Sequence, residues 1–129
     1  MLGGYGLVDD KFKNQEWVSP SLNTFADGAL YLNIYEIVKW ETGLNIKKIL
    51  KDKASFDPMW SPDETVSGMH VVKHGGTWQG FESYIIRVLD VKVTVVIFAN
   101  ADVADVEEIA SNVLEMFDSQ LALKSDENE

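Results

Sequence analysis

The residues with the clearest chemical potential lie in segment 71–81, where a histidine precedes two glycines as His74-Gly75-Gly76. Glycines in a strand let another backbone approach closely, and an imidazole donates or accepts a hydrogen bond near neutral pH. Trp78 lies between Gly76 and Gly80 and is a candidate to line a cleft, although the other tryptophans, in apolar settings, are expected in the core. The residues alone also fit a glycine-rich turn with an exposed histidine, and spacing by itself favours this simpler interpretation.

Two histidines, His70 and His74, are four residues apart, a spacing that binds zinc when it lies on a helix. The flanking valines and glycines predict a strand instead, on which the two side chains are about 13 Å apart. The sequence contains no cysteine, which excludes disulfides, zinc thiolates and a cysteine nucleophile. We therefore expect no metal site and no cofactor.

The first half of the chain predicts short helices. Residues 1–27 are polar and glycine-rich, so we expect loop with at most short strands. Asn33 is a good N-cap for a helix that Gly43 ends. The expected helices cover residues 34–42, 46–51 and 55–60.

The second half changes to the period of strands. We expect strands at 69–73, 81–89 and 92–100, with Asp90-Val91 as the turn between the last two. Asp102 is expected to cap a helix over 103–121, and the carboxylates of Asp105, Glu107 and Glu108 suit its N-terminal end better than a reactive site. The predicted fold class is α+β: short helices, then a three-stranded antiparallel sheet with a C-terminal helix packed on it. The expected apolar stripe of that helix is Val106, Ile109, Ala110, Val113, Leu114, Phe117 and Leu121.

The length and the net charge of the chain limit the classes of function that it can have. The 129 residues carry a formal net charge of −10, which argues against nucleic acid and against an anionic membrane as partners. The length favours a single domain over 1–129 with a short acidic tail at 122–129. The start has no basic residue before an apolar core, so we expect no signal peptide, and no run approaches 18 apolar residues.

Five segments in order resemble the C-terminal part of the serine β-lactamase-related hydrolases, which include class C β-lactamases, D-aminopeptidases and penicillin-binding esterases. They are Leu22-Asn23-Thr24-Phe25-Ala26-Asp27-Gly28-Ala29-Leu30-Tyr31, Glu36-Ile37-Val38-Lys39-Trp40, Met59-Trp60-Ser61-Pro62, His74-Gly75-Gly76-Thr77-Trp78-Gln79-Gly80-Phe81 and Val93-Thr94-Val95-Val96-Ile97-Phe98-Ala99-Asn100. In that family a strand with Lys-Thr-Gly or His-x-Gly flanks the active site and binds the substrate's carboxylate or backbone. The resemblance implies a substrate-binding role for His74, Gly75, Gly76 and Trp78.

The chain also departs from the family. Its nucleophile is the serine of Ser-x-x-Lys, and no serine here has a lysine three residues later. Tyr31-Leu32-Asn33 spells the family's Tyr-x-Asn, but the family places that motif upstream of this whole region. A Tyr-Gly-x-Gly-Trp strand usually precedes the histidine, and only seven residues separate Pro62 from His70 here. We therefore identify no catalytic residue.

Three functions follow from this pattern. The first is a non-catalytic remnant of such a hydrolase that acts by association or by binding a small ester or amide. The second is an enzyme part that becomes active when an N-terminal fragment supplies the nucleophile. The third is a structural or assembly module.

We also expect a homodimer, because the apolar strand 92–100 has only one terminal helix to cover it and strand 69–73 has lost its usual neighbour. The compartment stays open, although the family is often exported.

Overall fold

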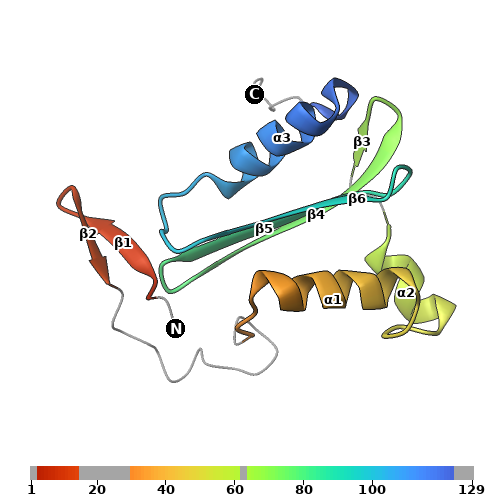
Figure 1. The fold of residues 1–129 in the computed structure, drawn as a ribbon, viewed down its shortest axis with the longest axis horizontal. Helices are drawn as coiled ribbons and strands as arrows, with labels where there is room; N and C mark the ends of the chain where they lie inside the picture. The colour runs from red at the N-terminus through yellow and green to blue at the C-terminus, as the bar shows by residue number, and fades with distance from the viewer. Residues whose placement is uncertain (1–2, 15–29, 62–63, 124–129) are drawn as a thin grey trace. The chain divides into compact units, whose positions relative to one another are not determined.

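The computed structural model describes residues 3–14, 30–61 and 64–123 (Figure 1). The chain divides into two compact units, one formed by residues 1–20 and 62–129 and the other by residues 21–61. Within the described residues the structure contains three α-helices and antiparallel sheets, which confirms the predicted α+β class. Residues 124–129 of the predicted acidic tail lie outside the described part.

The larger unit is built on a four-stranded antiparallel sheet with the order β3-β4-β5-β6. The strands are β3 (Glu64–Val66), β4 (Met69–Trp78), β5 (Phe81–Val88) and β6 (Val93–Ala99). The predicted three-stranded sheet is therefore wrong by one strand. The predicted open edge along 69–73 is also wrong for its first part, because Glu64–Val66 pairs with Met69–Val71.

Tight turns set the register of these strands. Ser67-Gly68 joins β3 to β4, Gln79-Gly80 joins β4 to β5, and all four residues have positive φ angles, as type I′ turns require. The connection from β5 to β6 is longer, from Leu89 to Lys92, and its only residue with positive φ is Lys92. Val91, a poor residue for positive φ, is thereby spared the strain that a two-residue turn at Asp90-Val91 would impose.

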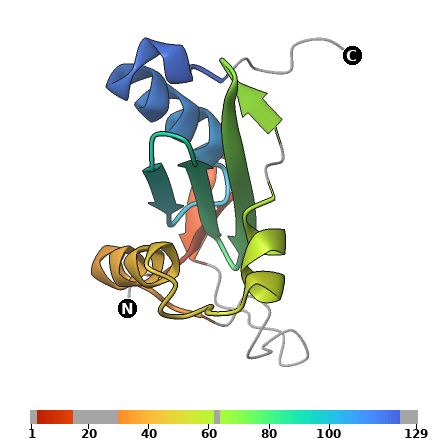
Figure 2. The ribbon, with the colours of Figure 1, turned by 90° about the vertical axis from the view of Figure 1, so that its right-hand side faces the viewer.

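Helix α3 (Val106–Phe117) covers one face of this sheet (Figures 1 and 2). Strand alternation turns Val71, Ile86 and Val88 toward the helix, which contributes Val106, Ala110 and Leu114 to the same buried cluster. The predicted apolar stripe is only partly buried. Three of its members are exposed: Ile109, Val113 and Phe117.

The start of α3 differs from the prediction. Asp105, rather than Asp102, is the N-cap, and its carboxylate accepts a hydrogen bond from the Glu108 backbone at 2.9 Å. Asp102 lies in the preceding turn, where its carboxylate accepts a bond from the Leu7 backbone at 3.3 Å. The helix then ends at Phe117 and a 3₁₀ turn, Ser119–Leu121, places Leu121 in the core.

A two-stranded hairpin of β1 (Tyr5–Val8) and β2 (Lys11–Asn14) attaches to the end of the large sheet. The Tyr5 N–H lies within hydrogen-bonding distance of the carbonyls of Gly80 and Asn100, and its own carbonyl accepts from Asp102. A Cβ on Gly80 would lie 2.5 Å from the Tyr5 nitrogen, so glycine is required for this approach. The expectation of short strands near the N-terminus is confirmed for the described residues.

The smaller unit contains α1 (Ile34–Asn45) and α2 (Lys53–Met59). Asn33 caps α1 as predicted and forms a capping box with Glu36. The helix continues past Gly43, and the predicted helix 46–51 is wrong because the backbone turns at Lys47, which has a φ of 54°. Asp52 caps α2, and the Phe56 and Trp60 rings meet edge to face at 5.4 Å.

The core beneath α3 gives a test of the fold. Leu114 is fully buried, so replacing it with alanine should lower the free energy of unfolding by about 2–5 kcal/mol. Glu115 is the next residue and is exposed, and its replacement by alanine should cost about 0.5 kcal/mol or less. Urea unfolding followed by circular dichroism measures both. Equal effects of the two substitutions would contradict the packing described.

Candidate functional site

The residues of the predicted site lie within strand β4 and not in a turn. Since successive side chains alternate between the faces of a strand, His74 and Trp78 lie on the face away from α3, while Gly75 lies on the α3 face. His74 is exposed and Trp78 is half-buried. A turn at Gly75-Gly76 would bring His74 close to Trp78, but the segment is extended, and four residues of strand hold their Cα atoms about 13 Å apart.

The two glycines stay in the strand because the neighbouring strand fills the space beside them. A Cβ at Gly75 would lie 3.3 Å from the Tyr84 ring, and one at Gly76 would lie 3.2 Å from the Ser83 hydroxyl. Gly75 and Tyr84 are direct cross-strand partners. The aromatic ring of Tyr84 therefore covers the missing side chain, and larger residues at Gly75 would displace it.

An open pocket of about 590 Å³ lies on the α3 face of this hairpin. Its walls come from the last part of β4, the first part of β5 and the segment that leads into α3. It brings together Gly75 and Gly76 from the predicted site but neither His74 nor Trp78. The side chains that matter chemically here are Thr77, Glu82, Tyr84, Asp102, Asp105 and Glu107.

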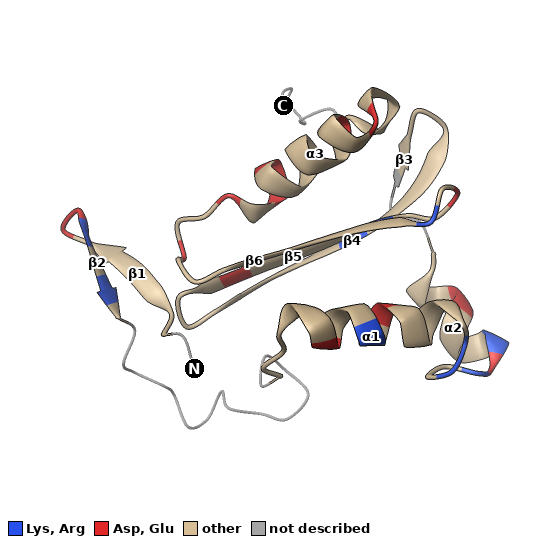
Figure 3. Cartoon of the chain, in the orientation of Figure 1, with Lys and Arg blue, Asp and Glu red and all other residues tan. Residues whose placement is uncertain are grey.

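Carboxylates dominate the electrostatics of the pocket, and Figure 3 shows acidic residues along α3 and the segment before it. The Tyr84 hydroxyl donates to Glu107 at 2.7 Å, and the Thr77 hydroxyl donates to Glu82 at 2.7 Å. The Lys73 ammonium lies 3.5 Å from Glu107. The hydroxyl protons are thus used internally, and the pocket offers acceptors and negative charge to a ligand.

Part of this negative charge has a structural role. Asp105 caps α3 and Asp102 binds the backbone of β1, as described above. Both carboxylates therefore stabilise the fold around the pocket, as the sequence predicted in general terms for the acidic residues at the start of this helix. Glu82 and Glu107 remain as the pocket carboxylates that side-chain hydroxyls orient.

His70, the other histidine of the sequence, contacts an aspartate. Its Nδ1 lies 3.2 Å from Asp90, and its backbone N–H donates to the same carboxylate at 2.6 Å. The backbone bond is the main cause that lowers the pKa of Asp90 below its usual 3.8. In the part of the chain that the structure describes, no three potential metal-ligating side chains come together.

The edge of β4 that faces away from β5 carries backbone groups with a defined direction. The Leu89 N–H donates to the His70 carbonyl, so alternation assigns the hydrogen-bonded pairs with β5 to His70 and every second residue after it. The backbone groups of Gly75 and Thr77 then point outward. Strand β3 reaches only to Val71, and no described strand pairs with β4 beyond that point.

Sequence reasoning missed Tyr84 and Glu107, which shape the pocket more than the predicted histidine does. Alternation along 81–88 would have placed Tyr84 on the same face as Ile86, but nothing in the sequence reports that Glu107 lies beside it.

In comparisons with known proteins, no family model matches the chain, and no curated protein or solved structure is detectably similar to it. Among the described residues, no helix is long and apolar enough to span a bilayer. Function must therefore be argued from the site itself.

The hydrogen bond between Asp90 and the His70 backbone predicts how the stability of the fold changes at acid pH. Because the folded pKa is below the unfolded value of 3.8, the contact stabilises the fold above that pH, and this stabilisation is lost as pH falls through the folded pKa. His70→Ala should leave the Asp90 pKa lowered, because the backbone N–H remains. A carbon-detected NMR titration of Asp90 measures this. Return of the pKa to 3.8 in His70→Ala would show that the imidazole is the cause.

Proposed function

We propose that this chain is a non-catalytic relative of the serine β-lactamase-related hydrolases that binds an extended amide or short peptide along the outer edge of β4. The observation that carries the proposal is the outward direction of the Gly75 and Thr77 backbone groups, on a strand that β3 pairs only as far as Val71. The resemblance of segment 74–81 to the family's substrate-binding strand supports the same edge.

The edge suits addition of a ligand strand. Outward N–H and C=O groups on alternate residues accept an extended peptide through main-chain hydrogen bonds. Gly75 presents no side chain to obstruct the approach, and the tyrosine that covers it is held by Glu107 at 2.7 Å. A ligand on this edge meets a rigid strand whose other edge is fully paired with β5.

The same residues do not support catalysis. The sequence has no Ser-x-x-Lys, and Ser83, the serine closest to the glycines, donates its hydroxyl to the Gly76 carbonyl at 3.1 Å. A serine nucleophile requires a base that accepts its proton, and such activation supplies orders of magnitude in rate. Binding without turnover is the result.

The charge of the adjacent pocket selects among ligands. The family's strand binds a carboxylate or a backbone, and Glu82 and Glu107 beside β4 oppose a carboxylate. We therefore favour a ligand with a neutral amide end. The preference distinguishes this chain from a hydrolase that recognises a free carboxyl terminus.

The proposal predicts that an N-acetylated tetrapeptide amide binds at the Gly75–Thr77 edge. Thr77→Pro removes the outward N–H and should weaken binding about tenfold or more, whereas Thr77→Val keeps the N–H and should bind normally. Amide shifts in a ¹⁵N NMR titration measure both affinities. The same peptide with a free carboxylate should bind more weakly than the amide.

The control for this experiment is hydrolysis of a chromogenic ester and a chromogenic β-lactam by the chain alone. We expect no turnover above buffer. Turnover that a serine-directed phosphonate abolishes would contradict a non-catalytic role, and equal binding by Thr77→Pro and Thr77→Val would contradict the proposed edge.

A further inference from the structure

Strand β6 is the opposite edge of the four-stranded sheet (Figure 2). Its outward backbone groups belong to Thr94, Val96 and Phe98, because the alternate residues bond to β5. Asn100 is the next residue in this alternating series, so its backbone should also point outward. Its carbonyl does accept a hydrogen bond from the Tyr5 N–H, at 3.0 Å. Tyr5 therefore occupies the edge from Asn100 onward, and no described strand pairs with the stretch before it.

The exposed stretch has none of the usual protections of an edge strand. Natural edges carry lysine, proline, bulges or inward-pointing charges that prevent pairing with another chain. Strand β6 reads Val-Thr-Val-Val-Ile-Phe-Ala, has no charged residue and pairs with β5 without a bulge. A chain of net charge −10 can therefore meet a second copy along this strand without placing like charges opposite each other.

Helix α3 carries an exposed apolar flank on the same side. Ile109, Val113 and Met116 are 44 %, 40 % and 88 % exposed and follow helical spacing. Glu107 is one residue after the buried Val106 and reaches toward β4 and β5, where it contacts Lys73 and Tyr84. Ile109 and Val113 are each one residue before a buried position, so they lie on the other flank, toward β6.

We infer that β6 and this flank of α3 form a self-association surface, on which a second copy of the chain adds its own β6 in antiparallel orientation. A twofold axis near Val95 places Thr94 opposite Val96 of the partner subunit, and the reverse pair forms by symmetry. This register leaves the edge at Asn100 to Tyr5. The two α3 flanks then face each other above the joined sheets.

The exposed flank supplies part of the area that such a dimer needs. Ile109, Val113 and Met116 together expose roughly 300 Å² per copy, if a large apolar residue contributes about 180 Å². A standard interface takes about 800 Å² per partner. The paired β6 strands add to this area, and Phe98 at that edge is 47 % exposed. The inference does not rest on the proposed function, because it uses the opposite edge of the sheet.

Equilibrium sedimentation of the full chain at tens of micromolar tests the inference. We expect twice the monomer mass of 14.5 kDa. Val96→Pro removes one outward N–H that the ladder with β5 does not use, so the variant should fold, keep its circular dichroism and sediment as a monomer. A monomeric wild type, or a dimer that Val96→Pro leaves intact, would overturn the inference.

A matched pair of charge variants tests the helix flank. Val113→Glu places a carboxylate on the flank and should weaken dimerisation at least tenfold, whereas Asn112→Glu adds the same charge to the neighbouring exposed position and should weaken it far less. Hydrogen exchange by ¹⁵N NMR should slow at Thr94 and Val96 as concentration rises. Equal effects of the two substitutions, or exchange independent of concentration, would contradict the surface.

Discussion

The contact between the Gln79-Gly80 turn and the Gly4-Tyr5 backbone is the constraint on which the larger unit depends. The turn has positive φ at both residues, so it fixes the register in which Trp78 pairs with Phe81 and every later pair follows. A Cβ at Gly4 would lie 2.0 Å from the Gln79 carbonyl, and one at Gly80 would meet Tyr5. Two glycines far apart in sequence therefore join the N-terminal hairpin to the sheet that carries the site.

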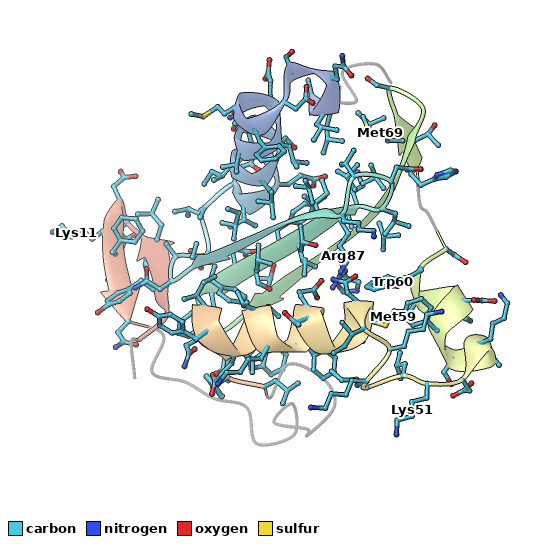
Figure 4. All side chains as sticks on the ribbon, turned by 45° about the vertical axis from the view of Figure 1, so that its right-hand side comes forward. Lys11, Lys51, Met59, Trp60, Met69 and Arg87 are labelled. Carbon is cyan, nitrogen blue, oxygen red and sulfur yellow. The ribbon has the colours of Figure 1, made fainter. Side chains whose placement is uncertain are left out.

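The register decides what each face of the sheet can do. One face receives Val71, Tyr84 and Ile86 and packs against α3, while the alternate positions place Arg87 on the opposite face (Figure 4). A slip of one residue would exchange these two sets. The pocket depends on the same register, because Gly75 lies directly opposite Tyr84 and leaves room for the ring whose hydroxyl donates to Glu107.

Local sequence predicted the elements whose signals are strong and short in range. The cap at Asn33 and the β-branched run that forms β6 are examples. The sequence-based prediction ended β4 at residue 73, because two successive glycines resemble a turn. In the structure, Tyr84 and Ser83 pack beside Gly75 and Gly76, and the strand stays extended. The prediction missed β3 because three residues give no periodicity, although Ser67-Gly68 is a turn signal. The pocket is shaped by the contact of Tyr84 with Glu107. These residues are 23 positions apart, so no local sequence pattern predicts their contact.

The two edges of the sheet differ in chemistry, and this difference separates the roles that we propose for them. The outer edge of β4 at Gly75 lies beside oriented carboxylates, so it suits a small polar ligand whose backbone can pair while its amide end meets Glu82 or Glu107. The edge of β6 is uncharged and adjoins an apolar helix flank, so it suits a large apolar surface. Since β5 separates them, a copy of the chain bound at β6 leaves β4 accessible. The association and the ligand binding that we propose are therefore compatible in one molecule, and neither needs a Ser-x-x-Lys nucleophile.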